Sequence, residues 1–150
     1  MNRSALALLA AAGLATALPA AAQFQKPEDA IKYRQSAFTV MASHFGRIAA
    51  MAQGKAPFDA AAAKANADIV ATMSRLPFAA FPAGTDSGQT KAKAEIWSEP
   101  DKFRQGATTM QEAVGRLQAA AGTGNLDQIK AAVGDVGKSC KACHDNYRKD

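Results

Sequence analysis

Apolar residues recur at spacings of three and four along most of the chain, a pattern typical of helices with one buried face. Alanine and other good helix formers occupy many of the positions between them. No segment shows a competing pattern typical of β-strands. The sequence therefore predicts an all-α protein.

Prolines, glycines and capping residues divide the pattern into four helical segments. Pro27 suits a first helical turn, and Asp59 is a suitable N-cap after Pro57. Pro77 is expected to stop the second helix. The first and third connections are short, which favours an antiparallel four-helix bundle. The predicted segments cover residues 27–54, 59–77, 100–122 and 126–147.

The longest irregular region lies between Pro77 and Pro100. It contains Phe78, Phe81 and Trp97, and a loop of this length in a compact domain is usually functional or disordered. The three aromatic side chains indicate that this region packs over another group rather than being disordered.

The first 22 residues have the outline of a secretory signal. A positive charge at Arg3 precedes an uncharged apolar stretch that ends at Leu18, and residues 19–22 form a small-residue cleavage pattern. The stretch is shorter than the roughly 20 residues of a membrane-spanning helix, although a retained anchor is the alternative. We predict cleavage before Gln23, a single domain at residues 23–150, and no later membrane-spanning segment.

Charge adds little to this assignment. Residues 23–150 hold 17 basic and 13 acidic residues, a net charge of +4, and the two signs are interspersed. Because no basic run follows the chain, the composition does not favour nucleic-acid binding.

The residues that indicate chemistry lie near the C-terminus, in the sequence Cys140-Lys141-Ala142-Cys143-His144. This is the C-x-x-C-H pattern for covalent attachment of c-type haem. On a helix, positions i, i+3 and i+4 share a face, so both thiols and the imidazole can reach one group.

Two other interpretations of the cysteines are weaker. A structural zinc site needs about four ligands, and His44 is the only other histidine. A thioredoxin-like disulfide would accompany a βαβ pattern, which is lacking here. We therefore predict one covalent haem c per chain, with His144 as the iron ligand.

The chain also resembles the cytochrome c′ family over essentially all of residues 23–150. The resemblance rests on the late haem motif within a helical bundle and on three strings, residues 32–37 (KYRQSA), 95–98 (EIWS) and 134–140 (GDVGKSC). It implies an up-down-up-down four-helix bundle, for which this family is itself a standard example.

The resemblance also implies roles for single residues. Phe38 is placed over the open, distal side of the haem iron, and Arg148 on the proximal side near His144. Arg34 and Gln35 resemble the partners of the haem propionates, and Glu95 is placed at the haem edge. A second interpretation of Arg148 is a solvated cation that complements the helix dipole.

These roles lead to an expected function. Phe38 cannot ligate iron, so the haem is expected to be five-coordinate and high-spin, in the periplasm, and to bind diatomic gases, chiefly nitric oxide and also carbon monoxide. The resemblance implies that nitric oxide can displace His144 and remain on the proximal side near Arg148. We do not expect an enzyme, because a peroxidase would need a distal His or Arg.

One alternative function remains. With a strong sixth ligand, for which Met41 is the nearest candidate, the protein would instead be a one-electron carrier served by an unidentified periplasmic electron donor.

His44 is interpreted as a packing or interface residue. A homodimer through the first two helices is also expected, with Met41, His44, Ile48 and Met51 as its stripe.

Overall fold

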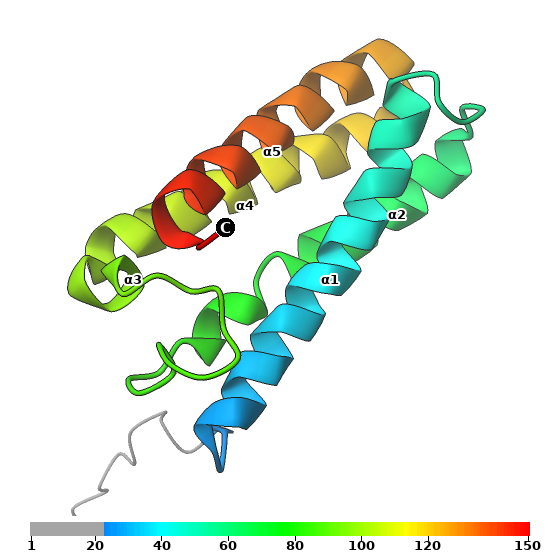
Figure 1. The fold of residues 1–150 in the computed structure, drawn as a ribbon. Coiled ribbons are helices and arrows are strands. Elements are labelled where there is room, and N and C mark those ends of the chain that lie inside the picture. The colour runs from blue at the N-terminus through cyan, green and yellow to red at the C-terminus, as the bar shows by residue number, and fades with distance from the viewer. Residues whose placement is uncertain (1–22) are drawn as a thin grey trace, which may run out of the picture.

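The computed structural model describes residues 23–150, so the predicted signal peptide at residues 1–22 lies outside the described residues. Four long helices and two short helical turns make up this part of the chain, and no strand occurs within it (Figure 1). The prediction of an all-α four-helix bundle is confirmed. The elements are α1 (Pro27–Ala52), α2 (Ala60–Met73), the 3-10 helix η2 (Pro77–Ala80), α3 (Glu95–Ser98), α4 (Pro100–Thr123) and α5 (Leu126–Tyr147).

Local sequence signals account for most helix ends. Pro27 and Pro100 each occupy the first helical position, where the missing N–H costs nothing. The Asp59 carboxylate accepts a hydrogen bond from the backbone N–H of Ala62 at 3.0 Å, as expected for an N-cap. Between α4 and α5, Gly124 adopts a left-handed conformation with φ of 68°, which glycine reaches without strain.

Helix α2 is shorter than the sequence predicts. It ends at Met73 rather than continuing to Pro77. Pro77 has no N–H to donate to the Met73 carbonyl and its ring crowds that turn, so the helix ends about four residues before the proline. The carbonyl oxygen of buried Ser74 accepts a hydrogen bond from the Gln111 side chain of α4 at 3.2 Å instead. This contact satisfies a carbonyl at the helix end.

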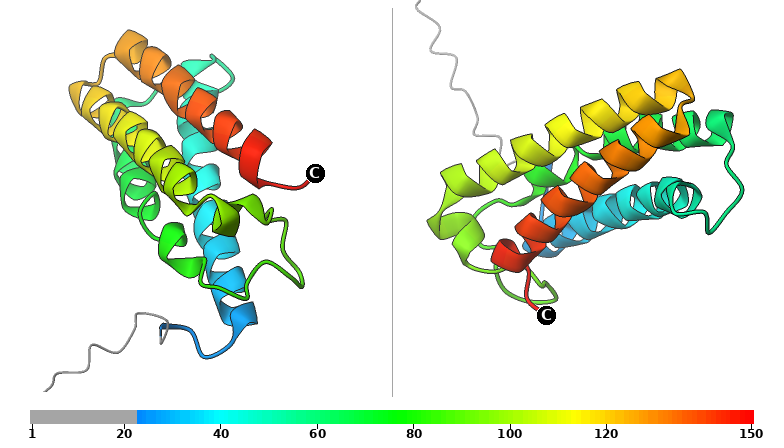
Figure 2. Two further views of the ribbon diagram at one scale, coloured as in Figure 1. Left: turned by 90° about the vertical axis from the view of Figure 1, so that its left-hand side faces the viewer. Right: turned by 90° about the horizontal axis from the view of Figure 1, so that it is seen from above.

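The four long helices form a closed ring in which α1 packs against α2, α2 against α4, α4 against α5, and α5 against α1. Helix α1 diverges from α4 and α5 toward the end of the bundle that holds α3 and the C-terminus (Figure 1). Two further views show the connecting segment around residues 82–94 at that same end (Figure 2). No helix within residues 23–150 is long and apolar enough to span a membrane.

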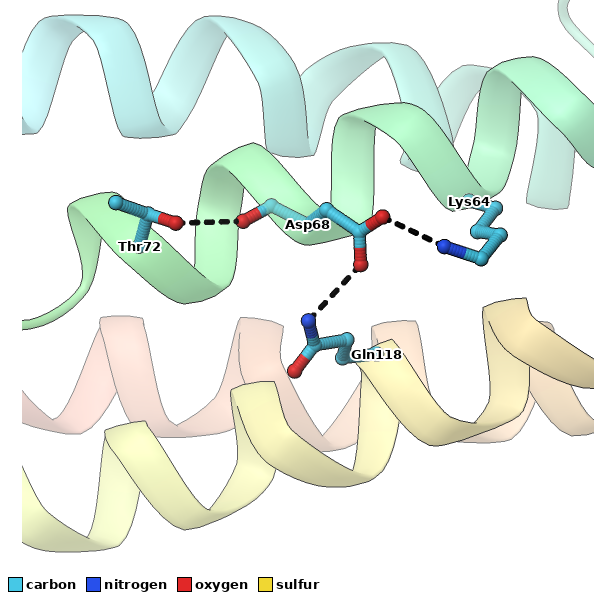
Figure 3. A network of polar contacts seen from close by, with 4 residues as sticks. All are labelled: Lys64, Asp68, Thr72 and Gln118. Atoms are coloured by element: carbon cyan, nitrogen blue, oxygen red, sulfur yellow. Dashed lines mark hydrogen bonds and ion pairs between the residues drawn. The ribbon is translucent and has the colours of Figure 1, made fainter.

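Polar contacts reinforce the seam between α2 and α4 away from this open end. Asp68 of α2 accepts hydrogen bonds from Lys64 at 2.8 Å and from Gln118 of α4 at 2.9 Å (Figure 3). The hydrogen bond from Lys64 and, to a smaller extent, that from Gln118 lower the pKa of Asp68. The ionised form is thus favoured in the folded state, so this contribution to stability is lost as the pH falls through the lowered pKa.

The structure corrects the predicted dimer stripe on α1. Met41, Ile48 and Met51 are no more than 9 % exposed and belong to the core of the chain itself. The ring of His44 shares a 2.7 Å hydrogen bond with Asn66 of α2, so it joins two helices of the same chain. The homodimer stays a prediction, but it would have to use other side chains. Within residues 23–150 the large apolar residues that remain exposed are Val40, Phe58, Ile69 and Leu76.

This correction changes the expected result of placing a carboxylate on that stripe. We expect Ile48→Asp to unfold the protein instead of producing a folded monomer, because Ile48 is fully buried and a charge there has no partner. The loss in the free energy of unfolding should exceed about 4 kcal/mol. Urea denaturation followed by circular dichroism measures it. Val40→Asp is the matched control on the exposed side of α1, with an expected change within about 0.5 kcal/mol. A folded, monomeric Ile48→Asp protein of unchanged stability would contradict the core assignment.

Candidate functional site

A cavity of about 740 Å³ lies between α1, α4 and α5. Most of its lining residues belong to these three helices, and Val70 of α2, residues 90–92 and Arg148 are among the others. The volume falls within the range of about 300–1,000 Å³ that is typical of ligand and cofactor pockets. Most of the lining side chains are apolar or aromatic.

Cys140, Cys143 and His144 all line this cavity from successive positions on one face of α5. Both cysteines are half-buried and form no disulfide. Burial raises the pKa of Cys140, while burial and the neighbouring Cys140 raise the pKa of Cys143. The two side chains therefore remain thiols near neutral pH and are directed to the same space.

His144 lies at the exposed edge of the cavity, one helical turn before Arg148. Partial burial and the positive charge of Arg148 lower the pKa of His144, against an opposing effect of Asp145. A lowered pKa favours the neutral imidazole, which is the form that binds a metal. Arg148 itself is placed by the backbone, because Ala92 and Arg148 form an isolated antiparallel bridge.

Aromatic rings line the side of the cavity near α3. Phe38 of α1 packs edge-on against Phe78 with ring centres 5.8 Å apart, and Phe78 packs against Phe103 of α4 at 5.7 Å. Phe81 and Tyr147 extend this cluster, each in contact with Phe103. All five rings line the cavity, so it offers a planar apolar group a rigid hydrocarbon wall.

Arg34 is a buried cation at this site, with only 2 % of its surface exposed. Its Nη1 donates to the Ala80 carbonyl oxygen at 3.0 Å and to Thr85 Oγ1 at 2.7 Å. Its Nη2 donates to the Thr85 carbonyl oxygen at 2.6 Å and to Thr90 Oγ1 at 2.8 Å. The guanidinium also lies 4.4 Å from the ring centre of Phe81. Burial lowers the pKa of Arg34 from its ordinary value. Arg34 thus holds the connecting segment in place.

Of the two other residues predicted at the haem edge, the structure places only one at the cavity. Gln35 lines the cavity, and its amide donates to the Gln89 carbonyl oxygen at 2.8 Å. Glu95 is exposed in the first turn of α3 and is not among the cavity-lining residues, so the structure does not bring it to the site. Trp97 does not line the cavity but packs against Phe81, which does. The two ring centres are 6.0 Å apart, and Trp97 Nε1 donates to the Phe81 carbonyl oxygen at 3.1 Å.

Comparison with known proteins identifies the family. A family model described as Cytochrome C′ matches residues 29–148, nearly the whole of the described chain. The chain belongs to the cytochrome c′ family. This assignment confirms the resemblance that the haem motif and the neighbouring strings indicated.

Solved structures of other cytochromes c′ are similar over the same region. The crystal structure from Rubrivivax gelatinosus is 56 % identical in sequence, with a TM-score of 0.82, and the match covers 85 % of this chain and 100 % of that one. Two structures from Alcaligenes xylosoxidans are each 55 % identical over 85 % of this chain. One is a nitric oxide complex of a variant, with 99 % of that chain covered and a TM-score of 0.81. The other is a carbon monoxide-bound variant, with 100 % covered and a TM-score of 0.80.

Membership of the cytochrome c′ family means that the chain carries covalent haem c. Cys140 and Cys143 are its only two cysteines, and the cavity they line is apolar and closed on one side by aromatic rings, which fits a haem. The sequence analysis did not predict a site role for residues 90–92 or Tyr147. Nothing in the local sequence marks residues 90–92, because long-range contacts, the Ala92–Arg148 bridge and the bond from Arg34 to Thr90, bring them to the cavity.

Proposed function

We propose that this cytochrome c′ binds small diatomic gases, chiefly nitric oxide and also carbon monoxide, at a five-coordinate, high-spin haem in the periplasm. The observation that carries the proposal is the set of ligating side chains around the cavity. Among the lining residues His144 is the only imidazole, and the rings of Phe38 and Phe78 offer no ligand. The complexes of the Alcaligenes xylosoxidans variants with nitric oxide and carbon monoxide support it.

Each residue then has a defined part in the proposed function. Cys140 and Cys143 hold the haem covalently, and His144 binds its iron. The haem supplies an iron centre with a free coordination position for a gas. Phe38 limits the space for a ligand and donates no hydrogen bond, which disfavours dioxygen, a ligand that gains from polar contacts. Arg148 keeps a positive charge beside His144 and disfavours protonation of the imidazole.

The alternative function is one-electron transfer with an unidentified periplasmic electron donor. It would be favoured by a second strong axial ligand, and Met41 and Met110 are the thioethers that line the cavity. Both are more than nine-tenths buried in the main core cluster, where they pack against other apolar side chains. This packing favours a structural role for both residues. We also propose that the protein is not an enzyme.

Spectra of the purified holoprotein test the proposed function directly. We expect a high-spin ferric electron paramagnetic resonance signal and a ferrous absorption spectrum that changes on addition of nitric oxide or carbon monoxide. Met41→Leu is the control, since it keeps a similar volume but removes the thioether, and it should leave both spectra unchanged. A low-spin wild type that becomes high-spin in Met41→Leu would instead establish Met41 as a ligand and favour the electron carrier.

A further inference from the structure

The charged side chains that line the cavity are all cations. They are Arg34, Lys91 and Arg148, and no Asp or Glu is among the lining residues. A haem brings two propionate carboxylates to the site. A carboxylate that leaves water without a charged or hydrogen-bonding partner is strongly unfavourable. Among the lining residues these three are the cations that could pair with a propionate.

Arg34 has little capacity left for a carboxylate. Each of its two terminal nitrogens carries two N–H donors, and all four donate to Ala80, Thr85 and Thr90. Only its Nε–H has no acceptor among residues 23–150. The forked pair of donors that recognises a carboxylate is thus used for the connecting segment.

Arg148 differs from Arg34, because it lies near His144. Arg148 follows His144 by four residues, and both residues line the cavity at the C-terminal end of α5. A cation in this position acts on the protein ligand of the iron. Lys91 is the cavity cation that neither bonds the connecting segment through its side chain, as Arg34 does, nor follows His144 on α5.

Lys91 is held at the cavity by its backbone while its side chain is free. Its carbonyl oxygen accepts a hydrogen bond from the Lys149 N–H at 2.7 Å, and the Lys93 N–H donates to the Tyr147 carbonyl oxygen at 3.0 Å. These bonds flank the Ala92–Arg148 bridge and form a clip between residues 91–93 and 147–149, called the C-terminal clip below. Within residues 23–150 the Lys91 ammonium group forms no ion pair.

We propose that Lys91 is a cofactor-binding residue whose ammonium group pairs with a haem propionate. Arg34 acts as a positioning residue, since its bonds to Thr85 and Thr90 order the segment that presents Lys91. The hydroxyl of Thr90 links the two, because it accepts from Arg34 and from the Ala92 N–H at 3.1 Å. The inference requires bound haem but not gas binding, so it can fail while the proposed function stands.

The test uses the holoprotein and two variants that each remove one positive charge from the C-terminal clip. Lys91→Met removes the proposed partner, whereas Lys149→Met is the matched control on the opposite side of the clip, outside the cavity. Losing a nearby cation destabilises a carboxylate, so the pKa of the propionate should rise by about one unit in Lys91→Met, a tenfold change in proton affinity. The pH dependence of the reduction potential reports this ionisation. In the holoprotein Cys140 and Cys143 are tied to the haem, so the other titratable groups that line the cavity are Arg34, His144, Tyr147 and Arg148, and both variants retain all four.

A second readout does not depend on either variant. When wild-type holoprotein is treated with acetic anhydride, mass spectrometry should show Lys91 acetylated severalfold more slowly than Lys149, because pairing with an anion keeps the amine protonated. Equal acetylation rates, or a propionate ionisation that Lys91→Met does not move beyond the effect of Lys149→Met, would overturn the inference. Slow acetylation with a shift specific to Lys91→Met supports it.

Discussion

Phe38→Ala is expected to raise the affinity for carbon monoxide and to lower the stability of the protein. Removing the ring enlarges the cavity from the α1 side and removes the contact between Phe38 and Phe78. Less crowding should raise carbon monoxide affinity tenfold or more, equivalent to roughly 1.4 kcal/mol. Because Phe38 is only partly buried, the loss in the free energy of unfolding should lie near the lower end of the range for such substitutions, about 3 kcal/mol.

Nitric oxide should respond differently to the same substitution. Its final affinity should rise less, because its favoured position is proposed to lie on the side of His144 and Arg148. Its first encounter should become faster, since Phe38 restricts access. Equilibrium titrations with carbon monoxide and stopped-flow mixing with nitric oxide measure these two quantities.

Phe45→Ala is the matched control for Phe38→Ala. Phe45 also lines the cavity from α1 and is also partly buried, but it lies about two helical turns away. It should lower stability by a similar amount and leave carbon monoxide affinity largely unchanged. Phe38→Met adds a complementary test, since a thioether at that position could coordinate iron and shift the spectrum toward low spin. The distal role of Phe38 would be wrong if carbon monoxide affinity stayed constant in Phe38→Ala and Phe38→Met stayed high-spin.

Replacing Cys140 and Cys143 together with Ala is expected to leave little stable holoprotein. The haem fills a cavity of about 740 Å³ between three of the long helices, so its loss removes packing as well as chemistry. Yield on a haem-stained gel and helix content by circular dichroism measure the effect.

Lys141→Ala is the control for the double cysteine variant. It changes a residue inside the same motif but keeps both thiols and removes only the exposed pair between Lys141 and Asp145, which is worth about 0.5 kcal/mol or less. It should give holoprotein at the wild-type yield. Recovery of a normally folded, haem-free bundle from the double cysteine variant at that yield would show that the haem is dispensable for folding.

The sequence by itself determined the features that depend on neighbouring residues. Helix boundaries follow from local chemistry, such as the proline at the start of α1 and the capping carboxylate of Asp59, and they were predicted to within a few residues. The haem motif is equally local, because the two thiols and the imidazole of His144 lie within five residues on one helical face. The family resemblance rests on the same short strings and was confirmed.

Tertiary structure decided which helical face meets which neighbour. Helical periodicity places Met41, Ile48 and Met51 on related faces of α1, but it does not tell whether another chain or another helix of the same chain covers them. The packing of α1 against α2 and α5 settles the question, and these residues belong to the core. The dimer stripe was therefore wrong although the periodicity behind it was correct.

Tertiary structure also decided what the charged residues do. Arg34 is a cation in a polar stretch of sequence, yet it is almost fully buried, because a segment some 50 residues later wraps around it and supplies four hydrogen-bond acceptors. Lys91 and Arg148 are far apart in the chain and meet only through the C-terminal clip. The free energy that selects these contacts comes from satisfying buried polar groups across the fold, and no local pattern of residues encodes which distant groups will satisfy them.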